Sequence, residues 1–232
     1  MTYWATPALS QQNFFNVPSS DITPGKALFV QQQFNLAASS IQSSTTMCVG
    51  LGHDYEVGLN VIGVTYDFKN QLTTNINTAP FSPMYAFNAQ KKVELSEHWK
   101  MGIGGQFGTN QAFNGGSYVF TNAIYKDEKT GTKLVAGLYR SSDGYFGPET
   151  RNFSENTDFK KLGIQMGIEK NLWNERLLFQ ADFISGRHAL GELVVGGAYY
   201  VSKHMVLSAG YQIPTFQSKS IDAVVVEFTW VP

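Results

Sequence analysis

Residues 160–183 read "KKLGIQMGIEKNLWNERLLFQADF" and hold two alternating patterns on either side of a short polar interruption. The first pattern repeats an apolar side chain at every second position: Leu162, Ile164, Met166 and Ile168. The second does the same with Leu177, Phe179, Ala181 and Phe183. A period of two predicts two extended strands, each with one apolar and one mostly polar face. The fold depends on the solvent that each face meets. A soluble sheet buries its apolar face, whereas a membrane barrel turns that face to lipid.

Composition favours the membrane alternative. The chain has 232 residues, of which 43% are hydrophobic, 14% aromatic and 15% charged, whereas soluble domains carry about 25% charged residues. No stretch approaches the roughly 20 consecutive apolar residues of a membrane helix, which excludes a helical membrane protein. The formal net charge is -1 and there is no basic run, so nucleic acid is not an expected partner.

Period-two alternation begins near residue 26 and continues to the C-terminus without a linker. It predicts an N-terminal segment, residues 1–25, followed by one β-barrel domain, residues 26–232. We expect strands at about 26–38, 41–52, 55–68, 82–95, 98–109, 116–127, 132–141, 159–170, 175–186, 190–201, 204–214 and 220–231. Their typical length of about 11 residues suits a tilted membrane-spanning strand. The predicted fold is all-β, a transmembrane antiparallel up-and-down β-barrel of about 12 strands.

The connections between these strands alternate in length. Short polar connections follow the second, fourth, sixth, eighth and tenth strands: "HDY", "SEH", "DEKTG", "NLWNE" and "SKH". Connections that are longer, or rich in Gly and Asn, follow the third, fifth and seventh strands. Bacterial outer-membrane barrels have short periplasmic turns and longer external loops. An even strand number then predicts that both chain ends lie on the periplasmic side.

Alternation also predicts which side chains face the lumen. The inward positions are small or polar, so we expect an inner wall without a packed apolar core. The lumen-lining set is Gln31, Gln33, Glu56, Lys100, Gln106, Lys161, Gln165, Glu169, Glu192 and Glu227. Two strands define their faces poorly, because residues 82–95 place Lys91 outward and both faces of residues 116–127 are equally apolar. The strand at 55–68 changes phase near Gly63, which indicates a β-bulge.

Aromatic residues mark one rim of the predicted barrel. Tryptophan and tyrosine are enriched at membrane interfaces because each ring is apolar while its N–H or O–H group seeks water. The predicted periplasmic strand ends carry an aromatic belt of Tyr55, Trp99, Trp173 and Trp230. Three of the four tryptophans therefore fall in one layer, as expected at a membrane interface.

The C-terminal ten residues, "AVVVEFTWVP", resemble the last strand that Gram-negative outer-membrane β-barrels present to their assembly machinery, with aromatic Phe228 and Trp230 at alternate positions. The match departs from the usual pattern because Val231 and Pro232 follow the last aromatic. "NVPSSDITPGKALFVQQQFN" and "LGHDYEVGLNV" are similar, more loosely, to porin-like or transporter-like barrels. The resemblance implies an exported protein that has lost its signal and lies in the bacterial outer membrane. The implied partners are the lipid bilayer with its lipopolysaccharide and the outer-membrane assembly machinery.

Residues that could carry chemistry are sparse. The single cysteine, Cys48, rules out an intramolecular disulfide and a thiolate metal cluster. Only His188, three residues after Ser185, is placed near the outer rim, and the His-x-Ser arrangement of barrel phospholipases is absent there. A catalytic triad is recognised by geometry rather than by closeness in sequence. We therefore expect no catalytic residue, no metal site, no cofactor and no enzymatic activity.

Two functions remain open from sequence. The first is a passive, porin-like channel for small solutes, with residues 1–25 either in the periplasm or folded into the lumen as a plug. The second is a non-conducting barrel that presents the loop at 142–158, with Tyr145, Phe146 and Phe153, for binding, adhesion or assembly. Inward charges of both signs predict no strong ion preference: Glu56, Lys92, Glu94, Lys100, Lys133, Lys161, Glu169, Asp182, Glu192 and Glu227. Conductance in planar bilayers would distinguish the two functions.

Overall fold

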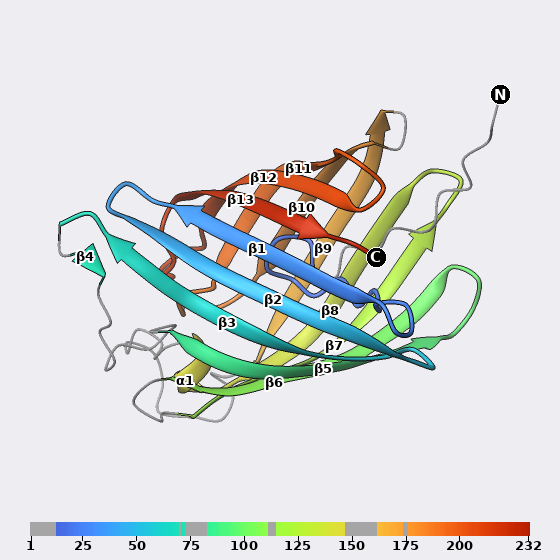
Figure 1. Cartoon of the computed structure of the whole chain (residues 1–232), viewed down its shortest axis with the longest axis horizontal. Helices are drawn as coiled ribbons and strands as arrows, with labels where there is room; N and C mark the ends of the chain where they lie inside the picture. The colour runs from blue at the N-terminus through green and yellow to red at the C-terminus, as the bar shows by residue number, and fades with distance from the viewer. Residues whose placement is uncertain (1–12, 70, 73–82, 111–114, 147–161, 174–175) are drawn as a thin grey trace.

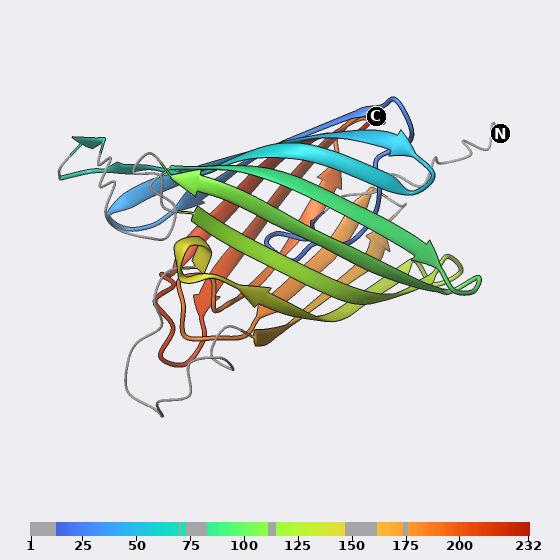
Figure 2. The ribbon, with the colours of Figure 1, turned by 90° about the horizontal axis from the view of Figure 1, so that it is seen from below.

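The computed structural model describes residues 13–69, 71–72, 83–110, 115–146, 162–173 and 176–232. They form a closed barrel of antiparallel strands (Figures 1 and 2). The elements are β1 (Leu28–Leu36), β2 (Ser40–Gly52), β3 (Tyr55–Asp67), β4 (Gln71–Leu72), β5 (Met84–Glu94), β6 (Trp99–Asn110), β7 (Gly115–Asp127), β8 (Thr132–Ser141), α1 (Asp143–Phe146), β9 (Leu162–Trp173), β10 (Leu177–Ile184), β11 (Glu192–Tyr200), β12 (Met205–Pro214) and β13 (Ala223–Trp230).

The topology is up-and-down. Each wall strand pairs antiparallel with the next along the chain, β3 pairs with β5, and β13 pairs with β1 to close the barrel. The two-residue strand β4 pairs with the end of β3, so twelve strands form the wall. The predicted fold class is confirmed, and the strand ends agree with the predicted ones to within about three residues. Period-two alternation locates such strands well because each must show one face to lipid along its whole length.

The strand connections sort onto two ends of the barrel. Short turns join β2 to β3, β5 to β6 and β7 to β8 at the end where the C-terminus lies (Figure 1). The tightest of them uses positive φ at Gly52, His53 and Asp54, a conformation that Gly and Asp tolerate best. Helix α1, which follows β8, lies at the opposite end (Figure 2). The short turns thus mark one rim of the barrel, called the short-turn rim below, and α1 marks the other.

Strand β3 contains the expected bulge. Ser43 pairs with Val64 but Thr45 pairs with Val61, so Ile62 and Gly63 together oppose one residue of β2. Gly63 has a φ of 76°, which a glycine adopts without a steric penalty. The extra residue changes the phase of the strand, and Val64 therefore faces outward, as Leu59 does in the first half.

The outer surface is apolar. Large apolar side chains that are between a third and two thirds exposed cover it, among them Leu28, Leu59, Ile103, Phe107, Leu138, Ile164, Val224 and Phe228. Lys91 does point outward, where its Nζ lies 2.7 Å from the hydroxyl of Tyr55 and 4.4 Å from the ring centre. Among the described residues, no helix is long and apolar enough to cross a membrane.

The inner wall differs from the expectation of a small or polar lining. Strand β7 turns Tyr118, Phe120 and Ile124 inward, which settles the face that the sequence left ambiguous. These side chains belong to one buried cluster with Phe14, Val17, Met84, Ala86, Val135, Tyr139, Tyr145 and Ile184. The expectation was wrong because it treated the lumen as water, whereas residues 13–25 enter it and give the apolar side chains something to pack against.

Candidate functional site: the lumen and its inner segment

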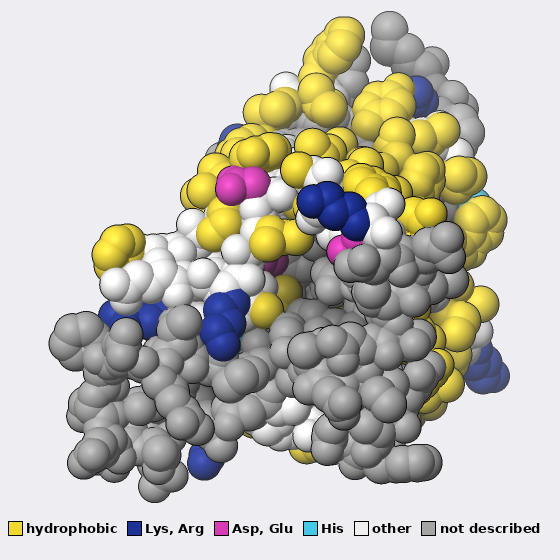
Figure 3. Space-filling view, turned by 90° about the vertical axis from the view of Figure 1, so that its left-hand side faces the viewer, with side chains coloured by type: hydrophobic (Ala, Val, Ile, Leu, Met, Phe, Trp, Pro, Cys, Tyr) yellow, Lys and Arg dark blue, Asp and Glu magenta, His cyan; other side chains and the backbone are white. Residues whose placement is uncertain are grey.

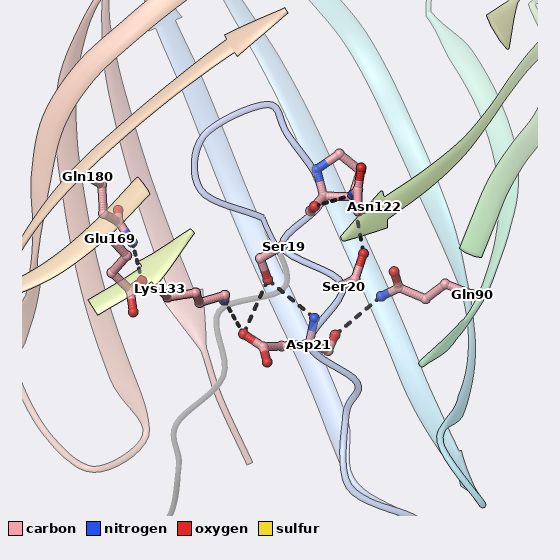
Figure 4. A network of polar contacts seen from close by, with 9 residues as sticks. Ser19, Ser20, Asp21, Gln90, Asn122, Lys133, Glu169 and Gln180 are labelled. Atoms are coloured by element: carbon pink, nitrogen blue, oxygen red, sulfur yellow. Dashed lines mark hydrogen bonds and ion pairs between the residues drawn. The ribbon is translucent and has the colours of Figure 1, made fainter. Parts of the chain in front are cut away.

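Residues 13–25, called the inner segment below, lie inside the barrel (Figures 2 and 4). They begin with a tight turn in which Asn13 bridges Pro18 and the Phe14 N–H donates to the Val17 carbonyl at 3.1 Å. The segment then runs to the short-turn rim, where Gly25 bridges Gly50 of β2 just before β1 starts. Main-chain pairing in the wall itself starts at Leu28, beyond the segment.

The tip of the inner segment is held by one carboxylate. An oxygen of Asp182, on β10, accepts the main-chain N–H groups of Phe15, Asn16 and Val17 at 3.0, 2.6 and 2.7 Å. Consecutive N–H groups that converge in this way form an anion-binding concavity. Hydrogen bonds to an ionised acceptor are also stronger than neutral ones. Asp182 is therefore the main polar anchor of the tip.

The side chain of Asn16 sits in a cradle built by two further strands. Its Nδ2 donates to Glu192 Oε1 of β11 at 2.7 Å, and its Oδ1 accepts from Gln33 Nε2 of β1 at 3.2 Å. Glu192 also accepts a hydrogen bond from Ser220, which precedes β13. Three strands of the wall, β1, β10 and β11, thus contact Asn16.

The second part of the inner segment, which contains Asp21 and Thr23 and is called its stem below, has its own anchors (Figure 4). Asp21 forms an ion pair with the buried Lys133 of β8, whose Nζ also lies 5.0 Å from the centre of the Phe14 ring. Burial alone would raise the pKa of Asp21, but the Lys133 ammonium, together with the charges of Lys126 and Lys92, outweighs it and holds the pKa below its ordinary value. The Thr23 N–H donates to Glu56 of β3 at 2.7 Å. One lysine therefore contacts both the tip and the stem.

Apolar packing completes the contact between segment and wall. Phe14, Phe15 and Val17 are fully buried. A methyl group at Gly167 of β9 would overlap the Phe14 ring, and one at Gly102 of β6 would overlap Ser20. These two wall glycines leave the space that the segment occupies. On the other side, a polar cavity of about 30 Å³ separates the segment from β2, β3, β5 and β6, enough for about two water molecules.

The predicted lumen-lining residues fall into three groups. Buried side chains are Gln31, Glu56, Gln165, Glu192 and Glu227. Half-buried side chains are Gln33, Lys100, Gln106 and Glu169. Lys161 lies outside the described residues, as does the loop at 142–158 beyond residue 146. Three of these residues contact the inner segment directly: Glu56 and Glu192 accept hydrogen bonds from it, and Gln33 donates one to it.

The remaining predicted residues have other surroundings. Gln165 binds the hydroxyl of Tyr118 and the amide of Asn122 across the wall, and Lys100 pairs with Glu94 at 3.1 Å near the short-turn rim. The four belt residues have exposed side chains: Tyr55, Trp99, Trp173 and Trp230. Trp99 packs on Tyr125, and Trp230 stacks on His204 at 5.3 Å. All four lie at strand ends of the short-turn rim.

The His188 and Ser185 pair does not have the geometry of a nucleophile with its base. His188 Nε2 lies 2.6 Å from the hydroxyl of Tyr139, whereas Ser185 Oγ accepts the Ile164 N–H at 2.8 Å. Burial lowers the pKa of His188 to about 4, so the ring is neutral at pH 7 and ties the β10–β11 connection to the wall. Within the ranges described, no group of three or more His, Cys, Asp and Glu residues could hold a metal ion.

Sequence reasoning missed the partners that the inner segment brings. Asn16 and Asp21 lie before the first strand, so alternation gives them no face. The stretch "NVPSSD" does carry turn residues, which predict a change of direction but not its location inside the barrel. Lys133 and Asp182 were recognised as inward charges, and only the structure shows what each contacts.

Comparison with known proteins rests on structure, because no protein-family model and no curated protein matches this sequence. The KdgM porin in complex with disordered oligogalacturonate superimposes with a TM-score of 0.59 at 6% identity, covering 88% of this chain and 99% of that one. The chain has the fold of an outer-membrane porin-like β-barrel. The NanC porin gives a TM-score of 0.58 at 7% identity, covering 89% of this chain and all of the other.

Figure 3 shows the described side chains from the end of the barrel where α1 lies. Hydrophobic side chains gather on the flanks of the barrel, and charged ones of both signs lie nearer its mouth. The described flanks are therefore apolar, as the lipid-facing band of a bilayer-spanning barrel is.

Proposed function

We propose that the chain is an outer-membrane channel for small solutes, whose lumen the inner segment closes in the conformation described above. The observation that supports this most is the way the segment is attached. Its anchors are side chains of the inner wall, such as Asp182 and Lys133, while the strands pair from Leu28 onward without it. The segment can therefore leave the lumen without breaking the hydrogen-bond ladder of the barrel.

The proposal assigns residues 1–25 to a plug and residues 26–232 to the barrel. We infer that the short-turn rim faces the periplasm, because outer-membrane barrels have short periplasmic turns, and that both chain ends lie there. The four belt residues would then mark the periplasmic interface, where exposed Trp and Tyr side chains are favoured. The bilayer and the assembly machinery are the partners that this placement implies.

The solutes of the structural neighbours do not identify the solute of this chain. The KdgM porin structure is a complex with oligogalacturonate, which carries carboxylates. This chain instead presents buried carboxylates of its own on the inner wall, among them Asp182 and Glu192. Two similar folds at 6% identity can enclose lumens of different charge.

Single-channel recording tests the proposal. The full-length chain and a chain without residues 1–25 are placed in planar bilayers side by side, and the truncated chain should conduct more while keeping heat-modifiable migration on gels. Full-length Asp182→Ala should also open more often, because three N–H donors lose their acceptor. Glu94→Ala is the matched control, since that carboxylate contacts rim lysines instead. Failure of every variant to conduct would refute the channel.

A further inference from the structure

The wall around Asn16 holds two buried carboxyl groups, Asp182 and Glu192. Among the described residues, Lys92 pairs with Asp54 and Glu94, Lys100 with Glu94, and Lys133 with Asp21. None of these three lysines pairs with Asp182 or Glu192. The two carboxyl groups lie on paired strands, with Asp182 opposite Val194 and Glu192 opposite Ile184.

The two carboxylates already bind a ligand, which is the chain itself. Asn16 donates its main-chain N–H to Asp182 at 2.6 Å and its Nδ2 to Glu192 at 2.7 Å, while Gln33 donates to its Oδ1 at 3.2 Å. The two carboxyl groups therefore accept N–H donors from two groups of one residue, the main chain at Asp182 and the side-chain amide at Glu192. All of the donors that the segment supplies are neutral, so none of them brings a positive charge to the carboxyl groups.

We propose that Asp182 and Glu192 bind the ammonium or guanidinium group of a small organic solute once the inner segment has left the lumen. The inference rests on the proposed channel function and names the class of solute. A cationic donor forms charge-assisted hydrogen bonds with the same two carboxylates, which are about twice as strong as neutral ones. Anionic solutes are repelled by the same wall.

Solute and inner segment compete for one place. Because Asn16 and the solute use the same acceptors, a cation binds only the conformation from which the segment has withdrawn. A ligand that binds one of two conformations shifts the equilibrium toward it. The cationic solute therefore opens the channel that it enters, and the closed lumen stays sealed in its absence.

The test uses the full-length protein and a matched pair of probes. Butylguanidinium and its uncharged isostere butylurea are titrated into the detergent-solubilised chain by calorimetry. Butylguanidinium should bind about tenfold more tightly or better, as expected when one ligand adds charge to its hydrogen bonds. The double variant Asp182→Asn with Glu192→Gln should lose this preference. Glu169→Gln is the control, because that carboxylate lies on the same inner wall and bonds to Gln180.

Bilayer recordings with the same proteins separate this inference from the channel proposal. Butylguanidinium should raise the opening frequency of the full-length chain, and the reversal potential in a salt gradient should favour cations until the double variant removes that preference. Conductance without any preference for butylguanidinium over butylurea overturns the cation site and leaves the channel standing. Selective binding with no conductance from any variant, including the truncated chain, supports the cation site and overturns the channel. Heat-modifiable migration confirms that each variant is folded.

Discussion

The outer surface and the inner wall of this barrel follow different rules. The outer surface is mostly apolar, since most strands contribute exposed apolar side chains such as Leu59, Ile103 and Ile164. The inner wall has two unlike parts. Around β7 and β8 it is an aromatic cluster that includes Tyr118 and Tyr139. Across β1 and β10 to β13 it carries buried amides and carboxylates beside two smaller apolar clusters, which Phe29 and Phe15 join.

Each face matches what it contacts: the outer surface meets lipid, and the inner wall meets the inner segment. Lipid is the same all around the barrel, so one rule serves every strand. The lumen is filled by a segment with two unlike sides: Phe14 and Val17 join the aromatic cluster, whereas the N–H groups of residues 15–17 meet Asp182. The inner wall is therefore matched to one peptide, and substitutions should have effects that depend on which part of it they touch.

The largest expected effect lies in the aromatic part. Tyr118 is almost fully buried and stacks on Tyr145 with ring centres 5.4 Å apart. Tyr118→Ala should lower the free energy of unfolding by about 3–5 kcal/mol, because it leaves a cavity among rings that cannot close over it. Urea unfolding in lipid vesicles measures the change.

Gln31→Leu is the substitution to compare with Tyr118→Ala, because it lies in the part of the inner wall that carries amides and carboxylates. Its Nε2 is buried without a hydrogen-bond partner, so replacing it should cost less than about 1 kcal/mol or even stabilise the barrel. Equal losses for Tyr118→Ala and Gln31→Leu would contradict the division of the inner wall into two parts.

The outer surface should respond next most strongly. Ile164 faces outward and is 46% exposed, so Ile164→Arg should cost about 2–4 kcal/mol if the position lies near the bilayer midplane. Ile164→Val, which keeps the lipid contact, should cost about 0.5–1.5 kcal/mol at most. On the inner side, Gln33→Arg should be milder. Gln33 contacts Asn16, which the carboxyl groups of Glu192 and Asp182 also contact, so the new positive charge would lie near two acidic groups. Unfolding in vesicles compares the three, and an Ile164→Arg barrel as stable as the wild type would show that this face does not meet lipid.

A smaller effect is expected where the inner segment is latched. Asp21→Asn removes the charge that pairs with Lys133, and a hydrogen bond to a charged group contributes about 1.5–3 kcal/mol. The ratio of open to closed channels should therefore rise about tenfold to a hundredfold, while the unfolding of the barrel changes little. Single-channel recording gives the ratio. Glu94→Gln, at an exposed rim position, should leave it unchanged.

The smallest effect is confined to one connection. Burial lowers the pKa of His188 from 6.5 to about 4, so the unfolded connection binds a proton at a higher pH than the folded one. Its stability is complete above pH 6.5, falls as the pH is lowered toward 4, and changes no further below that. The amide-exchange protection factors of residues 185–191, which correct for the intrinsic pH dependence of exchange, should fall as the pH is lowered across this window, and His188→Gln should abolish that fall. A uniform fall in protection over the whole barrel would mean that another group is responsible.

Alternation in the sequence determined the wall of this protein. Each strand must keep one apolar face to lipid over its full length, so the pattern at 160–183 gave both the strands and the outward set that includes Ile164 and Met166. Even the bulge at Gly63 was visible, because one extra residue exchanges the two faces of everything after it. These features follow from local order along the chain and a solvent that is the same everywhere.

The contents of the lumen were decided only by the tertiary structure. Both faces of β7 are apolar in sequence, and Tyr118 turned inward because Tyr139, Tyr145 and Phe14 arrive there from distant parts of the chain. The contact of Asp182 with residues 15–17 joins positions more than 160 residues apart. No period in the sequence encodes such a meeting, since it depends on closure of the barrel, which brings β10 and the inner segment into one enclosed space.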